Sequence, residues 1–397
     1  MATGNQLQSF TTKSAPDLRP QGEAGLRIVL LRKVPEESSL QRRWNDLVLQ
    51  MKRPEVFFTC EWALAVQAAY HSSRKPLVLL GYDGDELVGV ACLSTDASGR
   101  NVSFLTATTA DYCDFVSPPQ RRAEFVEAVF AELRCLKISS LVLANLPADS
   151  ATAAVVRAAA KKHGLHAHMR PAYACSQVKL GTAEQRQELK TTVARKRQLK
   201  RCLKMMEREG PVTLSFLRSW SEIEPMLPVF AATHVARFRT TKHTSFLSTP
   251  ERRVFMEDLA RRSTAAGLMT MTVLKVGERA VAWSYGFQVH GVWFLYQTTF
   301  DTRCQDNSPG YCLLAKILIE ACDLSSLGLV DLGLGAEVYK EWFANSTRQT
   351  LHVTLNPSRL RHLREVARYG LANNVKRFPK LEAAIRKARS GLRRGVD

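Results

Sequence analysis

The chain has 397 residues, 45% of them apolar, and a formal net charge of +19. A chain of this length and composition can bury two cores of ordinary size, which excludes a mostly disordered protein. Nine cysteines without a CxxC pair argue against a disulfide framework and a structural zinc site. With no run of about 18 apolar residues, the sequence predicts a soluble cytoplasmic protein, and a peripheral place at the inner membrane face stays open.

The positive charge is concentrated in two segments. Lys190 to Arg208 hold eight Lys and Arg against Glu207, a net of +7, and Arg359 to Arg394 hold twelve against Glu365 and Glu382, a net of +10. Together they account for +17 of the +19. The basicity therefore belongs to these segments and not to the folded domains.

The first half begins with a polar lead of about 25 residues, predicted to be flexible. A hairpin of PLVLLGY and LVGVACLS follows around a DGDE turn, and then a strand at 102–106. After DYCDFVSPPQ, the sequence predicts the helix RRAEFVEAVFAELRCL, the strand SSLVLANL and the helix SATAAVVRAAAKKHG.

The first basic segment, at 188–210, is predicted to be a helix between two domains. Its apolar Leu189, Leu199, Leu203 and Met206 are spaced for one face, and Gly210 ends it. Its basic side chains form either a solvated face or a contact with a polyanion.

The second half repeats the pattern of the first. LMTMTVLKV, RAVAWSYGFQV and VWFLYQTTF predict a three-strand meander, followed by a helix, the short strand LGLVDLGLG and a helix at 338–344. The hairpin LLGYDGDELVGVACLS matches VLKVGERAVAWSYGF, which indicates a tandem duplication. The second basic segment, from Arg359, is predicted to form one or two helices with a break near Phe378 and Pro379. These helices could lie on RNA, on an anionic membrane or back on the domains.

These pieces, in this order, resemble the acyltransferase module of the GNAT superfamily (Gcn5-related N-acetyltransferases). The stretches that carry the resemblance cover most of Leu40 to Ala344: the basic helix closing on MEREG, THVARF, TPERRVFMEDLA, GERAVAWSYGF, YQTTFD, SPGYCLL and VDLGLGAEVYKEWFA, with DYCDF in the first half. The likeness is to the double-domain CelD-like and BioF2-like acetyltransferase group, and more distantly to the FemABX peptidyltransferases.

The resemblance implies an α/β fold with an α+β mixed sheet, built from tandem GNAT-like domains joined by a basic helix. Its expected parts are a lead at 1–25, a first GNAT-like domain at 26–180, a basic linker helix at 181–210, an acyltransferase domain at 211–357 and a basic helical tail at 358–397. It also implies acyl-CoA as co-substrate, with no metal. The acetyl or longer acyl group would pass to an amine or hydroxyl of a sugar, peptide, or cell-envelope or polysaccharide precursor.

The junction Ser308-Pro309-Gly310 is predicted to start a helix. Ser308 is a suitable N-cap whose oxygen accepts from N–H groups one turn in, Pro309 fits the first helical position, and Gly310 permits close approach of a ligand. Such an end suits a phosphate, although a capped helix without a ligand fits these residues as well. The resemblance implies that the pyrophosphate of coenzyme A binds here. Gln297, Thr299 and Tyr311 complete the expected cofactor-binding residues.

Two features depart from the family pattern. The usual (Q/R)xxGx(G/A) loop is reduced here to a single glycine. The counterpart in the first half is SPPQ, with two prolines and no glycine, and two rigid rings leave less room for a backbone to approach a phosphate. We expect the first copy to lack a cofactor.

Acyl transfer from a thioester needs a base for the nucleophile, a donor for the carbonyl oxygen and an acid for the leaving thiolate. The resemblance implies a backbone N–H donor around Gln297 to Phe300. Candidates for the proton steps are Asp301, Glu337, Tyr339 and His234. Each has a structural alternative: Asp301 as a turn cap, Glu337 and Tyr339 as an exposed first helical turn, and His234 as a structural histidine.

Two other functions stay open. An aminoacyl-tRNA donor would replace coenzyme A if the FemABX likeness is the better guide, with 190–208 and 359–394 following the RNA backbone. Alternatively, the protein is a non-catalytic scaffold whose tail binds an anionic membrane or a partner. The acceptor, the acyl length and the oligomeric state are not encoded in these patterns.

Overall fold

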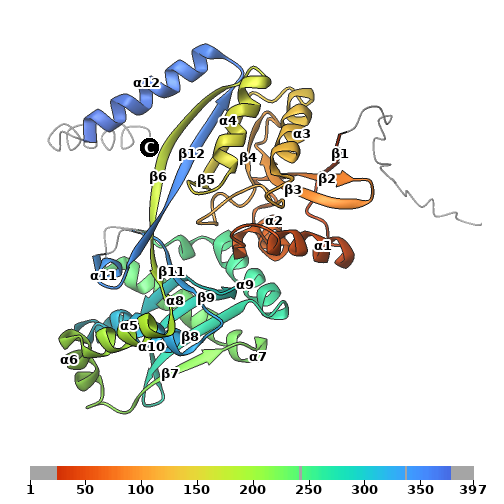
Figure 1. Cartoon of the computed structure of the whole chain (residues 1–397). Helices are drawn as coiled ribbons and strands as arrows, with labels where there is room; N and C mark the ends of the chain where they lie inside the picture. Colours follow the sequence, from red (N-terminus) through yellow and green to blue (C-terminus); the bar gives the residue numbers. More distant parts are fainter. Residues whose placement is uncertain (1–24, 241–243, 336–337, 377–397) are drawn as a thin grey trace, which may run out of the picture.

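The protein folds as two repeats of one order of elements (Figure 1). The structure is a computed structural model that describes residues 25–240, 244–335 and 338–376, with side chains up to 370. The predicted lead at 1–25 and the break near Phe378 therefore lie almost wholly outside the described residues. The first repeat comprises β1 (Arg27–Leu31), α1 (Ser38–Leu49), η1 (Val56–Phe58), α2 (Cys60–Tyr70), β2 (Lys75–Asp83), β3 (Glu86–Thr95), β4 (Asn101–Phe104), α3 (Arg122–Cys135), β5 (Ser140–Pro147), α4 (Thr152–Lys162) and β6 (His166–Lys179).

The second repeat follows the same order, with two short additions, α7 and η3. It comprises β7 (Val212–Leu217), α7 (Trp220–Ile223), α8 (Met226–Arg239), η2 (Phe246–Ser248), α9 (Pro250–Ala265), β8 (Met269–Val276), β9 (Arg279–Val289), β10 (Val292–Phe300), η3 (Thr302–Asn307), α10 (Pro309–Asp323), β11 (Leu329–Leu334), α11 (Val338–Glu341) and β12 (Ser346–Asn356). The predicted meander, helices and short strand are confirmed in both halves. The turn between β9 and β10 has positive φ at His290 and Gly291, the conformation that matches the twist of a two-residue hairpin.

The twelve strands of the described residues form one mixed sheet. Their order is β1-β2-β3-β4-β5-β12-β6-β11-β10-β9-β8-β7. Reading this order from either end gives corresponding strands of the two repeats, β1 with β7 through β5 with β11, and β12 with β6. The α/β fold class and the tandem arrangement are thus confirmed.

The two repeats exchange their last strands at the centre of the sheet. β12 of the second repeat lies between β5 and β6 of the first, and β6 in turn pairs with β11 of the second. In Figure 1, β6 and β12 run as two long neighbouring strands between the upper and lower parts of the molecule. Because each repeat completes its sheet with the other's strand, the repeats form one structural unit.

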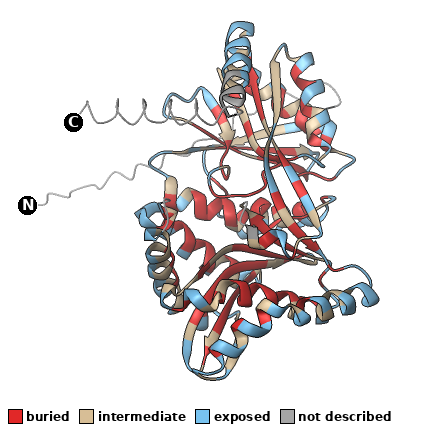
Figure 2. Ribbon diagram, turned by 90° about the vertical axis from the view of Figure 1, so that its left-hand side faces the viewer, coloured by how far each residue is buried: buried red, intermediate tan, exposed pale blue. Residues whose placement is uncertain are grey.

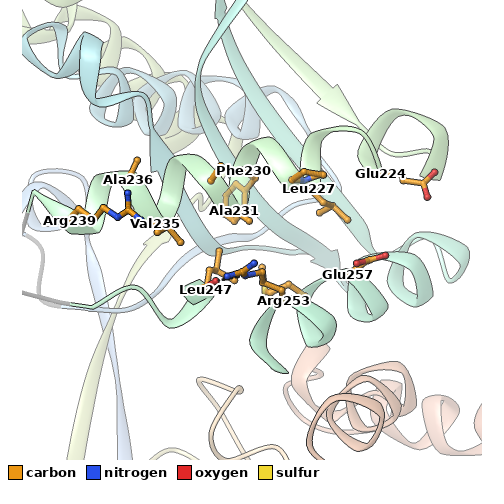
Figure 3. A pocket seen from close by; sticks show the side chains of 13 residues that line it. Glu224, Leu227, Phe230, Ala231, Val235, Ala236, Arg239, Leu247, Arg253 and Glu257 are labelled. Atoms are coloured by element: carbon orange, nitrogen blue, oxygen red, sulfur yellow. Dashed lines mark hydrogen bonds between the residues drawn. The ribbon is translucent and has the colours of Figure 1, made fainter. Parts of the chain in front are cut away.

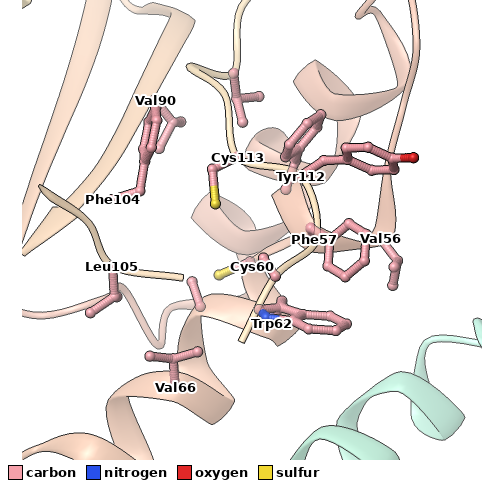
Figure 4. Packing of buried hydrophobic residues seen from close by; sticks show 14 of the residues in the cluster. Val56, Phe57, Cys60, Trp62, Val66, Val90, Phe104, Leu105, Tyr112 and Cys113 are labelled. Carbon is pink, nitrogen blue, oxygen red and sulfur yellow. The ribbon is translucent and has the colours of Figure 1, made fainter. Parts of the chain in front are cut away.

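Two hydrophobic clusters cover the faces of this sheet. Figure 2 shows the buried residues in red along the strands and the helices. The larger one includes residues of both repeats: Trp62 of α2 lies 5.6 Å, between ring centroids, from Phe255 of α9, and Phe57 lies 4.7 Å from Phe294 of β10. Figure 4 shows the part of it around Phe57, Trp62 and Tyr112. The smaller cluster joins α5, α6 and α10 to the opposite face of β8–β11. This packing places α8 and α9 on one face of the second-repeat strands and α10 on the other.

The linker is two helices where the sequence predicts one. α5 (Ala183–Arg195) and α6 (Arg197–Met206) are separated by Lys196, whose ψ of 122° is not helical. The break lets Val193 and Leu199 both reach the smaller cluster, and Lys196 donates to the Trp342 carbonyl at 3.1 Å. Packing therefore overrides the continuous helical periodicity of the segment.

A last helix, α12 (Arg359–Lys376), follows β12 and contacts β6 and β12. It begins where the second basic segment was predicted to become helical. None of the helices in the described parts of the chain has the length and apolarity needed to span a bilayer.

Candidate active site

β10 and β11 of the second repeat are paired along only part of their length. Their parallel pairing covers Val292–Phe294 and Leu329–Asp331, whereas β10 continues to Phe300 and β11 to Leu334. A bulge shifts the register between β10 and β9 from Phe294 to Gln297, and a bulge bends the strand that carries it. The bend of β10 therefore opens a gap between the two strands.

A cavity of about 90 Å³ lies at this gap. Its lining comes from α8, β10, α10, β11 and α11: His234, Arg237, Phe238, Leu295, Tyr296, Gln297, Thr298, Gly310, Leu313, Leu314, Ile317, Leu332, Leu334, Tyr339 and Lys340. Because α8 and α10 cover opposite faces of the sheet, a cavity lined by both passes through the sheet.

The start of α10 borders this cavity through Gly310. A Cβ at this position would lie 3.2 Å from Cδ1 of Phe300, so glycine keeps the approach open. Pro309 is the first helical residue, as predicted. Within the described residues, the Gly310 N–H has no acceptor, which suits an anion at the positive end of the helix.

Ser308 differs from the prediction. It lies in the left-handed region, with φ 48° and ψ 54°, and its side chain makes no capping hydrogen bond. Instead its backbone carbonyl accepts from the N–H groups of Tyr311 and Cys312 at 3.0 and 3.1 Å. The preceding helix η3 ends against α10, and this tight junction requires a left-handed residue where a cap would be extended.

His234 is buried in the cavity wall. Its Nδ1 lies 2.8 Å from Ser245 Oγ, its ring stacks on Phe238 at 4.5 Å, and Gln297 hydrogen-bonds it. Burial lowers the pKa of His234 to about 4. The imidazole is therefore neutral at physiological pH and a weak base, and it positions Gln297 at the cavity.

Arg237 fixes the edge of β10 that faces the gap. It donates to the Thr298 carbonyl at 3.1 Å and lies over the Phe300 ring at 4.6 Å. Asp301 N–H donates to Val281 of β9, so the alternation of an antiparallel strand turns the backbone of Thr298 away from β9. Within Gln297 to Phe300, Thr298 and Phe300 both turn their backbone away from β9, and of these two Thr298 lines the cavity.

Asp111 of the first repeat reaches the same gap. Its Oδ2 accepts from the Leu334 N–H at 2.8 Å, while Lys340 Nζ donates to the Leu334 carbonyl at 3.0 Å. A Cβ on Gly333 would lie 3.0 Å from Asp111 Oδ2 and 3.4 Å from the Leu295 carbonyl. The carboxylate therefore stands at the mouth of the separated strands.

The environment of Asp111 favours the protonated acid. Burial, followed by the neighbouring Asp331, raises its pKa to about 7, although the Leu334 N–H and Lys340 act against this. A carboxyl with this pKa exchanges a proton readily near neutral pH. The sequence pointed to DYCDF as a family stretch but assigned Asp111 no role, because its burial depends on residues more than two hundred positions away.

The structure brings four of the predicted site residues together: His234, Gln297, Gly310 and Tyr339 line the cavity. The remaining expected cofactor residues do not line it: Thr299, Ser308, Pro309 and Tyr311. Asp301 does not line it. Its carboxylate accepts from the Arg303 backbone and pairs with the Arg303 guanidinium at 2.8 Å, which lowers its pKa. Glu337 lies outside the described residues.

A larger cavity of about 720 Å³ lies between α8 and α9 (Figure 3). Its floor is apolar, with Phe230, Leu247 and Met256, and its rim carries charged side chains such as Arg239 and Glu257. None of the predicted site residues lines it. We therefore choose the smaller cavity as the candidate site, because polar groups converge there at the gap between two strands, and not by cavity volume.

The start of α3 in the first repeat is filled by its own side chains. Arg122 is buried there, 3.1 Å from Asp114, and donates to Thr152 Oγ1 and the Ser117 carbonyl. The guanidinium is thus buried and already paired with a carboxylate, a hydroxyl and a carbonyl.

The described residues thus form two α/β repeats with a polar cavity between two strands of the second. Residues 194–341 match the family model described as Acetyltransferase (GNAT) domain. This match identifies a GNAT-type acetyltransferase domain at residues 194–341, and with it an acyltransferase. No curated protein sequence matches it.

Solved structures share the fold over most of the chain. FemX is 9% identical, with a TM-score of 0.56 over 79% of this chain and 95% of that one. The C-terminal domain (DUF2156) of a putative lysylphosphatidylglycerol synthetase from Agrobacterium fabrum is 10% identical, with a TM-score of 0.50 over 85% and 96%. A conserved protein of unknown function from Bacteroides thetaiotaomicron is 12% identical, with a TM-score of 0.50 over 80% and 97%.

Proposed function

We propose that the protein transfers an acyl group from acyl-CoA to an amine or hydroxyl of a sugar, peptide, or cell-envelope or polysaccharide precursor. The observation that carries this proposal is the cavity through the sheet, with Gly310 and the N-terminus of α10 on one side and Asp111 near the other. A donor and an acceptor that approach from opposite faces would meet in the gap between β10 and β11.

The residues at the α10 face fit a phosphate-bearing donor. The Gly310 N–H and the helix dipole favour a pyrophosphate, and α6 packs against both η3 and α10. Its Arg197, Lys200, Arg201 and Lys204 are exposed. These side chains would add positive charge beside the helix start, which gives the first basic segment a role as an anion contact.

We assign a residue at the gap to each proton that is transferred and to the negative charge that develops during acyl transfer. The Thr298 N–H would stabilise the negative charge that develops on the thioester oxygen. Asp111 would accept the proton of the attacking amine or hydroxyl, and Tyr339 would protonate the leaving thiolate. His234 would hold Gln297 in place. Glu337 stays a proposed orienter of the acceptor.

Calorimetric titration with acetyl-CoA tests the donor, with Gly310→Trp as the site variant. We expect binding to the parent protein and at least about tenfold weaker binding to the variant, since an indole at this position occupies the donor's path. Gly25→Trp is the matched control, because a Cβ there meets nothing within 4 Å. Thermal melts of both variants establish that they fold. Absence of heat at millimolar acetyl-CoA would reject the donor.

A FemABX-like transfer from aminoacyl-tRNA is the second candidate. The likeness to FemX favours it, and the exposed basic residues of α6 suit RNA as well as a nucleotide. Binding of tRNA should then fall steeply between 50 and 200 mM salt. Retention of tRNA at low salt by a protein that ignores acetyl-CoA would select this candidate.

A further inference from the structure

Helix α12 rests on the sheet through one narrow polar face. Ser358, His362, Glu365 and Tyr369 are its half-buried residues, and their spacing of three or four places them on one side. Three contacts hold this face: the His362 ring lies 5.7 Å from that of His166, Arg170 lies 4.8 Å over the Tyr369 ring, and Asn356 donates to Glu365 at 2.9 Å.

The apolar residues of α12 face solvent. Leu360 is 59% exposed, Leu363 52% and Val366 38%. Their spacing of three residues makes a continuous stripe along the helix. A helix packed on a sheet ordinarily turns such a stripe inward, whereas here polar and aromatic contacts replace it. α12 extends away from the second repeat at the top of Figure 1 and contributes nothing to the lining of the site cavity.

Arginines flank this stripe. Arg359, Arg361, Arg364 and Arg368 are all exposed. Glu365, the one acidic residue between Arg359 and Lys376, is turned to Asn356 and away from the stripe. The outer surface of α12 is therefore apolar in its middle and cationic at its border.

We propose that α12 docks on an anionic lipid bilayer. The leucine stripe would enter the boundary between headgroups and acyl chains, and the arginines would contact lipid phosphates. RNA also carries negative charge, but exposed leucines contribute little to RNA binding. The leucine stripe therefore favours a membrane as the partner. The inference stands independently of the acyl donor.

Co-sedimentation of the full-length protein with vesicles tests this surface. Vesicles of phosphatidylcholine alone are compared with vesicles in which about one lipid in three is phosphatidylglycerol. We expect binding only to the anionic vesicles. Leu360→Ser/Leu363→Ser should weaken it at least about tenfold, and Arg361→Gln/Arg364→Gln/Arg368→Gln about 100-fold.

Leu49→Ser is the matched control. Leu49 of α1 is 53% exposed, so its replacement removes one leucine of similar exposure at a distant place and should leave vesicle binding unchanged. Circular dichroism checks the fold of each variant. Equal binding to neutral and anionic vesicles would overturn the proposal. So would the absence of vesicle binding together with tRNA retention that depends on the arginines and not on the leucines.

Discussion

The carboxylate of Asp111 accepts a hydrogen bond from the Leu334 N–H at 2.8 Å, so a loop of the first repeat is fixed to the end of a strand in the second. This contact joins residues 223 positions apart and places a carboxyl with a pKa of about 7 beside the gap in the sheet. The first repeat thereby supplies a side chain to the site that the second repeat forms.

Asp111→Asn should abolish most of the acyl transfer. The amide oxygen can still accept from Leu334, but it cannot take the acceptor's proton, so we expect kcat/KM to fall by about 100-fold or more. In the parent protein, kcat/KM should rise with pH through about 7 and then level off. In the variant, this rise of kcat/KM around pH 7 should be absent. Asp323→Asn, which alters an exposed pair with Lys190, is the control. Full activity of Asp111→Asn would remove Asp111 from the mechanism.

The same residue should make stability depend on pH. Its pKa is raised from 3.8 to about 7 by burial, so the folded protein holds this proton more tightly than the unfolded chain. The stabilisation is complete below about pH 4 and is lost as pH rises through 7, by at most about 4 kcal/mol. Urea denaturation of the parent and of Asp111→Asn between pH 4.5 and 8 measures the difference. Parallel curves for the two proteins would contradict the raised pKa.

Arg348 of β12 holds the exchanged strand to the first repeat. Its guanidinium pairs with buried Glu55, lies 3.1 Å from Asp149 and stacks over the Tyr112 ring at 4.3 Å. Arg348→Met should lower the free energy of unfolding by about 3 to 5 kcal/mol, because it leaves Glu55 buried and unpaired.

The double variant Arg348→Met/Glu55→Gln should recover part of that loss in urea denaturation, since the unpaired charge is gone. Arg303→Met breaks an exposed pair with Asp301 and should cost no more than about 1 kcal/mol. A loss from Arg348→Met as small as that from Arg303→Met would show that the buried pair contributes little.

Truncation should separate the roles of β12 and α12. A chain ending at 357 keeps β12 and should unfold cooperatively like the parent. A chain ending at 345 exposes the edges of β5 and β6 to solvent, and such unpaired edges aggregate. Size-exclusion chromatography and thermal melts distinguish the two. A soluble, cooperatively folded 1–345 would mean that the repeats do not depend on the exchanged strand.

Local patterns predicted much of the second repeat and part of its site. The apolar spacing of α10 placed Leu313, Leu314 and Ile317 against the sheet, and all three are buried. The site residue that these patterns missed is Asp111, because DYCDF shows two carboxylates and a tyrosine but nothing of what surrounds them. Ser308 was assigned a capping side chain because capping preference is local, whereas its left-handed backbone is imposed by the junction of two helices.

The sequence by itself determined the meander of each half and the helix, strand and helix that follow it, the glycine at the start of α10 and the segregation of charge. These follow from periodicity, turn residues and composition, which act over a few neighbouring residues. Only the tertiary structure decided that β6 and β12 are exchanged, that Lys196 breaks the linker helix, that α12 turns its leucines outward and that Asp111 meets Leu334. Strand pairing, burial and pKa depend on groups distant along the chain, and no local pattern encodes those partners.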